Sequence, residues 1–149
     1  MNKKGLFLLG FAEGANLPLM AKAIYYSFEL HKGQKRNDGT DYIDHPFDTC
    51  IILINNGVTD EVTLVTGLLH DTKEDTGISY SDLLCAFGDD VADRVSSLTK
   101  EKGISLDLYF ANIKDPREVL VKTADRMHNM NDMAKCLSRE RLEKYIKET

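Results

Sequence analysis

Tryptophan is absent from this 149-residue chain, and both cysteine and long apolar runs are scarce. The three cysteines, Cys50, Cys85 and Cys136, are odd in number and form no CxxC pair. This pattern argues against a disulfide framework and against a zinc–thiolate site, so we expect an intracellular, cytoplasmic protein. No stretch approaches the roughly 18 apolar residues that a membrane helix needs, and we expect no membrane partner.

The chain also has no excess of basic residues, since its formal net charge is -5. Proteins that bind nucleic acid as their main partner usually carry a basic stripe for the phosphates, and we therefore expect no nucleic acid here. A local basic patch could still hold a small anion. A homo-oligomeric assembly is left open by the composition.

A short apolar run from Leu6 to Ala12 follows two lysines near the N-terminus, an order that also occurs in secretory signals. The run is much shorter than the core of such a signal, and Glu13 ends it. We therefore do not expect a cleaved signal.

Strand patterns are missing as well, whereas apolar residues recur at helical spacing along most of the chain. Pro18, Ser79 and Asp115-Pro116 are typical helix starts, and Gly33, Asn56-Gly57 and Gly88 are typical stops. The pattern predicts an all-α, single-domain protein over residues 1–149, with a core from about residue 18 to residue 136. The predicted helices cover residues 18–31, 46–55, 60–71, 79–87, 89–99, a span from 115 onward and 138–145, and residues 100–114 form a short helix or a packed loop.

The stretch from Leu68 to Thr76 holds the densest group of ionisable side chains, namely His70, Asp71, Glu74 and Asp75. If the preceding helix continues through them, residues four apart share one face of it. Burying a carboxylate without a partner is costly, and a cation is the simplest partner for Asp71 beside a neutral His70. The stretch therefore predicts a metal site or a proton-transfer site.

Two other segments supply further polar side chains. His45 precedes Pro46, which favours an extended conformation at the start of the next helix, so the imidazole could point into a site. Taken alone, such a histidine is more often a cap or a packed side chain. On the late helix a polar stripe runs at steps of three and four residues, a pattern that is usually a solvated face: Lys122, Asp125, Asn129 and Asp132.

Together these segments offer two imidazoles and two carboxylates, from His45, His70, Asp71 and Asp125. A mixed nitrogen and oxygen set suits a borderline-hard divalent ion such as Mn²⁺, Fe²⁺ or Zn²⁺. Four protein ligands leave open positions on an ion that prefers six, and one of these would carry water.

The same residues occur in five motifs that follow one another in the chain. The motifs are His31-Lys-Gly-Gln-Lys-Arg36, Asp41-Tyr-Ile-Asp-His45-Pro, Leu68-Leu-His-Asp-Thr-Lys-Glu-Asp-Thr76, Ala86-Phe-Gly88 and Val121-Lys-Thr-Ala-Asp-Arg-Met-His-Asn129-Met. In these motifs the sequence resembles the HD-domain metal-dependent phosphohydrolases, and most closely the hydrolase domain of the Rel/SpoT proteins and the small alarmone hydrolases. The resemblance implies an HD-type helical bundle.

The resemblance further implies that the substrate is guanosine tetra- or pentaphosphate, (p)ppGpp, which loses its 3′-pyrophosphate with Mn²⁺ as cofactor. The residues that match the family's metal ligands are His45, His70, Asp71 and Asp125. Glu74 and Asp75 match the acidic pair that positions or deprotonates the attacking water. Arg36 matches the phosphate-side arginine, and Asn129 matches a residue near the nucleoside.

Some features depart from the family pattern or leave alternatives open. Lys73 and Thr123 replace residues that are usually apolar, and the stretch from Thr99 to Pro116 is shorter than in the relatives. We expect no alarmone synthesis, because the 149 residues leave no room for a synthetase domain. The alternatives are an HD phosphohydrolase for NADPH or a deoxynucleotide, a non-catalytic nucleotide sensor, and a helical domain without a site.

Overall fold

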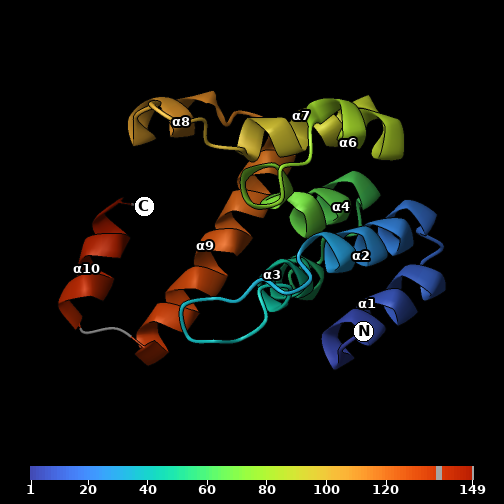
Figure 1. Ribbon diagram of the computed structural model, residues 1–149, viewed down its shortest axis with the longest axis horizontal. Coiled ribbons are helices and arrows are strands. Elements are labelled where there is room, and N and C mark those ends of the chain that lie inside the picture. Colours follow the sequence, from blue (N-terminus) through green and yellow to red (C-terminus); the bar gives the residue numbers. More distant parts are fainter. Residues whose placement is uncertain (137–138, 149) are drawn as a thin grey trace.

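The computed structural model describes residues 1–136 and 139–148, and the regular structure in these ranges is helical (Figure 1). One isolated β-bridge joins Lys35 to Asp41 in the loop after the second helix. The helices are α1 (Lys3–Gly14), α2 (Pro18–Leu30), α3 (Asp44–Asn55), α4 (Glu61–Leu69), α5 (Thr72–Asp75), α6 (Tyr80–Phe87), α7 (Asp89–Leu98), α8 (Leu106–Asn112), α9 (Pro116–Cys136) and α10 (Arg139–Glu148). The predicted all-α, single-domain fold is confirmed. Among these helices, none is both long and apolar enough to cross a membrane.

Helix α4 lies at the centre of the bundle and packs against α2, α3, α7 and α9 (Figure 1). Every residue from Thr63 to Leu69 is buried, so this helix is enclosed on all sides rather than on one face. Helix α1 packs against α2 and α3 and closes the outer side of the bundle. The central position of α4 matters because the residues that follow it carry the candidate site.

Gly67 allows α4 to approach α3 closely. A Cβ atom at this position would lie 2.9 Å from Cδ1 of Leu53, which is itself buried in the core. A glycine inside a helix costs about 1 kcal/mol relative to alanine, and the close helix contact is the compensation.

The N-terminal helix α1 was not predicted, since the expected helices begin at Pro18. The run from Leu6 to Ala12 lies inside α1, where Leu8 and Ala12 are buried in the core while Leu6 and Phe7 are exposed. Its apolar residues do not keep to one stripe of helical spacing, which is why the periodicity did not reveal the helix.

The predicted extended conformation of His45 is wrong. Helix α3 begins at Asp44, so His45 lies in its first turn and Pro46 is the third helical residue. Proline is tolerated there because the first backbone N–H groups of a helix have no partner within the helix. The imidazole nevertheless points inward, with only 1% of the residue exposed.

The helix expected through His70 and Asp71 also ends sooner than predicted. Helix α4 stops at Leu69, the two site residues form a turn, and the short α5 starts at Thr72. Both residues keep right-handed helical backbone angles, with φ -58° and ψ -29° at His70 and φ -98° and ψ -3° at Asp71. Even so, the single continuous helix on which the shared faces depended does not form.

Other predicted boundaries are confirmed. Ser79 and Asp82 form a reciprocal capping box at the start of α6. Pro116 opens α9, the 21-residue helix that carries the polar stripe. Residues 100–114, predicted to form a short helix or a packed loop, contain the short helix α8. The predicted closing helix is α10, which starts at Arg139, and Ser138 lies outside the described residues.

The close contact at Gly67 predicts different responses to one substitution at two glycines. Gly67→Val should lower the free energy of unfolding by about 1–3 kcal/mol, because overpacking a filled core costs about that much. Gly10→Val is the matched control, since Gly10 lies within α1 and a Cβ atom there would have no neighbour within 4 Å. This control should change the stability by less than about 0.5 kcal/mol. Urea unfolding followed by circular dichroism measures both, and equal stabilities would contradict the assigned close contact.

Candidate metal centre

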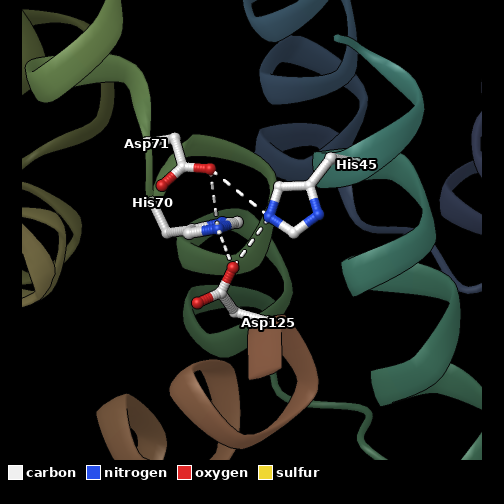
Figure 2. Close-up of side chains that lie close together, drawn as sticks. All are labelled: His45, His70, Asp71 and Asp125. Atoms are coloured by element: carbon white, nitrogen blue, oxygen red, sulfur yellow. Dashed lines mark hydrogen bonds and ion pairs between the residues drawn. The ribbon is translucent and has the colours of Figure 1, made fainter. Parts of the chain in front are cut away.

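Four side chains from three parts of the bundle converge on one point (Figure 2). His45 comes from the first turn of α3, His70 and Asp71 from the turn after α4, and Asp125 from the middle of α9. One nitrogen or oxygen atom of each lies within 4.8 Å of the corresponding atoms of the other three. The structure thus brings together the four residues that the sequence predicts as ligands.

The two imidazoles and two carboxylates alternate around this point. Nε2 of His45 lies 2.7 Å from Oδ1 of Asp125 and 3.4 Å from Oδ2 of Asp71. Nε2 of His70 lies 3.2 Å from the same Asp125 oxygen and 3.1 Å from the same Asp71 oxygen. The four atoms therefore face a shared centre, as the dashed lines in Figure 2 show.

Local backbone geometry sets the tautomer of His70. Its Nδ1 lies 2.7 Å from the carbonyl oxygen of Gly67, an atom that can only accept a hydrogen bond. Nδ1 must therefore carry a proton, and in the neutral ring this leaves the lone pair on Nε2, which faces the centre. This is the arrangement in which histidine binds a metal ion.

Burial and charge act on the four groups in opposite directions. Burial lowers the pKa of His45. Burial also disfavours a charged His70, but the neighbouring Asp71 and Asp125 outweigh it and raise the His70 pKa. Burial would raise the pKa of both aspartates, yet the contacts with the histidines outweigh it and lower both values well below the usual range. Both carboxylates are thus ionised in a site where His45, His70 and Asp125 are each at most 4% exposed.

This donor set fits a divalent cation. Two buried carboxylates carry two negative charges, and burying such charges is costly without compensation. Imidazole nitrogen with carboxylate oxygen suits borderline or hard ions, and the arrangement does not distinguish among Mn²⁺, Fe²⁺ and Zn²⁺. The cluster can therefore hold a divalent metal ion.

Glu74 and Asp75 lie beside the four-residue centre but are not part of it. Both residues are in α5 and are exposed as whole residues, although each carboxyl group is partly shielded from solvent. A carboxylate oxygen of Glu74 accepts a hydrogen bond from the backbone N–H of Lys100. The backbone carbonyl of Asp75 accepts one from the Gln34 side chain, at 2.9 Å. Their assignment as a catalytic pair stays a prediction.

Arg36 and Asn129 contact each other in the wall of a pocket beside the centre. Nη2 of Arg36 donates to Oδ1 of Asn129 at 2.9 Å and forms an ion pair with Asp132 at 3.4 Å. Both residues line an open pocket of about 350 Å³ whose wall also includes His45, Asp71 and Asp125. The predicted substrate residues thus share one pocket with three of the four predicted metal ligands, and their roles stay predictions.

Besides Arg36, the pocket contains residues to which the sequence assigned no role, including three more basic side chains. The basic side chains around it are Lys35, Arg36, Lys122 and Arg126. Nζ of Lys122 lies 3.1 Å from Oδ2 of Asp125, and the Tyr42 hydroxyl donates to Oδ2 of Asp71 at 2.6 Å. The spacing of the polar stripe on α9 contained the signal for Lys122. No periodicity indicated Tyr42, which lies in a loop.

Comparisons with known proteins agree with this geometry. Residues 23–106 match the sequence profile of the HD domain family. A GTP pyrophosphokinase of Streptomyces antibioticus is 39% identical over 147 residues, which are 92% of this chain and 17% of that protein. A guanosine-3′,5′-bis(diphosphate) 3′-pyrophosphohydrolase of Spiroplasma citri is 35% identical over 150 residues, 88% of this chain and 20% of that protein. This chain therefore spans about a fifth or less of the length of these relatives.

A solved structure shows the same fold. A metazoan SpoT orthologue that hydrolyses ppGpp superposes with a TM-score of 0.77 at 29% sequence identity. The superposition covers 87% of this chain and 80% of that one. The all-helical fold of the two chains is therefore shared over most of their lengths.

The clustered donors predict metal-dependent stability. A ligand that binds only the folded state at 100 times its Kd adds about 2.7 kcal/mol of stability, so adding MnCl₂ should raise the Tm of the metal-free protein. Asp125→Asn removes one anionic ligand and should abolish this shift, whereas Asp107→Asn, at an exposed position of α8, should keep it. Differential scanning fluorimetry with and without EDTA measures the effect. An equal shift in both variants would contradict the site.

Proposed function

This chain belongs to the HD domain family, and from that membership we propose that it is a metal-dependent phosphohydrolase of (p)ppGpp. The reaction adds water to the phosphorus that is bonded to the 3′ oxygen and breaks that P–O bond. ppGpp would give GDP and pyrophosphate, and pppGpp would give GTP and pyrophosphate. The similarity to relatives named for this chemistry supports the choice of substrate.

The observation that carries the proposal is a buried group of two carboxylates and two imidazoles at a pocket that basic side chains also line. Asp71 and Asp125 line this pocket together with four basic residues, namely Lys35, Arg36, Lys122 and Arg126. A substrate that meets both features must present several negative charges. A guanosine with diphosphates on its 5′ and 3′ oxygens has this character, since one diphosphate can reach the centre while the basic side chains hold the other.

Different residues of the pocket would bind the metal ion and the phosphates during hydrolysis. A divalent ion bound to His45, His70, Asp71 and Asp125 supplies Lewis-acid chemistry, offsetting phosphoryl charge and making water more acidic. Arg36 would donate its planar fork of N–H groups to phosphate oxygens. Its present partners, Asn129 and Asp132, hold the guanidinium in the pocket wall.

Glu74 and Asp75 would position the attacking water and take up its proton. Partial burial of each carboxyl group, together with the negative charge of nearby Asp71, raises its pKa above the ordinary value. A carboxylate with a raised pKa is a stronger base, which suits it to proton transfer. The backbone N–H of Lys100 holds Glu74 in place from the segment that precedes α8.

Product analysis tests the proposal directly. Purified protein is incubated with ppGpp, NADPH or dGTP, with and without Mn²⁺, and the products are separated by anion-exchange chromatography. We expect GDP and pyrophosphate from ppGpp only when Mn²⁺ is present. Turnover of NADPH or dGTP alone would reject the alarmone substrate, and metal binding without turnover of any of the three would indicate a sensor.

Substitutions separate the roles of the residues. Glu74→Gln should lower kcat by about 10²–10⁴-fold, the usual contribution of a general base, with Mn²⁺ affinity unchanged. Arg36→Met should mainly raise KM for ppGpp, because it removes a phosphate partner. Lys32→Met removes an exposed cation that pairs with Glu29 outside the pocket, and both constants should stay unchanged. Steady-state kinetics measures all three, and wild-type kcat in Glu74→Gln would refute its role.

A further inference from the structure

His128 lies directly behind the ligand histidine of α3. It is on α9 one turn after Asp125, and 9% of the residue is exposed. Its Nδ1 lies 2.6 Å from Nδ1 of His45, on the side of that ring that faces away from the centre, and the two rings are 4.9 Å apart between centroids. His128 thus contacts a proposed ligand without being one.

The chemistry of the two rings fixes where their protons must lie. When Nε2 of His45 serves as a ligand, the proton of the neutral ring is on Nδ1. That N–H must donate to Nδ1 of His128, which therefore needs its own lone pair. The proton of a neutral His128 must then be on Nε2.

A carboxylate stands at the position that this arrangement requires. Oδ2 of Asp48 lies 3.0 Å from Nε2 of His128, and a carboxylate can only accept a hydrogen bond. Nζ of Lys4 lies 2.7 Å from the same Asp48 oxygen, and Asp132 is more distant from His128 Nε2, at 3.8 Å. The chain of contacts runs from His45 through His128 and Asp48 to α1 at the edge of the bundle.

We propose that His128, oriented by Asp48 and Lys4, is a positioning residue that holds His45 in the tautomer able to bind the metal ion. A ligand histidine usually donates its second N–H to a carboxylate or a backbone carbonyl, groups that can only accept. His70 follows that rule through Gly67. His45 instead faces a ring that can donate or accept, so Asp48 is needed to make it an acceptor.

The inference rests on the proposed metal centre but not on the identity of the substrate. It also gives a role to the contact between Lys4 and Asp48, through which α1, a helix before the residues that match the family profile, is connected indirectly to the site. A histidine that only filled space could be replaced by another ring of similar size without effect on the metal.

Mn²⁺ affinity, measured without substrate by the electron paramagnetic resonance of the free ion, tests the proposal. His128→Phe keeps a ring but removes the acceptor, and it should weaken Mn²⁺ binding by 10–100-fold, the usual cost of losing such a partner. His128→Asn places a carboxamide oxygen near the position of Nδ1, so it should weaken Mn²⁺ binding by less than about 10-fold, the lower end of that range. Circular dichroism checks that both variants fold. Equal affinity in a folded His128→Phe variant would overturn the proposal.

A second measurement needs no variant. In ¹⁵N-histidine-labelled protein loaded with Zn²⁺, two-bond ¹H–¹⁵N correlation spectra assign the tautomers. The proposal requires a proton on Nδ1 of His45 and on Nε2 of His128, and a proton on Nδ1 of His128 would contradict it.

If the unaltered protein bound neither Mn²⁺ nor Zn²⁺, the metal centre itself would fail and this inference with it. Metal binding without ppGpp turnover would refute only the proposed substrate.

Discussion

The structure depends on the convergence of two ionised carboxylates and two imidazoles within a helical core. Asp71 and Asp125 bring negative charge to a buried place, where charge is stable only with partners. The partners come from three elements far apart in the chain, α3, the turn after α4, and α9. Helix packing around the enclosed α4 therefore has to be accurate at the point where these elements meet.

Side chains of opposite charge lie close together around that point. The cluster of two carboxylates and two imidazoles suits a metal ion, whereas the four basic side chains that line the same pocket suit an anionic group. An acidic chain with a net charge of -5 can therefore still have an anion-binding pocket, because four basic side chains line this one. Lys122 connects the two groups of charges, since it forms an ion pair with Asp125 and also lines the pocket. On the opposite side, His128 and Asp48 connect the centre to α1.

Much of the fold and of the candidate site was predictable from the sequence. Pro18, Pro116 and the capping box at Ser79 marked helix starts that the structure confirms. Boundaries set by tertiary contacts were not predictable. Helix α1 depends on packing against α2 and α3 rather than on a clear apolar stripe. The break after Leu69 lies within a run whose local pattern continues as a helix.

The sequence by itself determined the fold class, the helices with strong caps, and the set of residues able to bind a metal, because these depend on local periodicity and side-chain chemistry. Only the tertiary structure decided how those residues meet. It placed His45 inside a first helical turn, brought His70 and Asp71 to one point from the turn between α4 and α5, and separated the carboxylates of Glu74 and Asp75 from the centre. It alone revealed His128 behind His45, a contact between residues 83 positions apart. Such contacts follow from the packing of α3 against α9, which local sequence patterns do not encode.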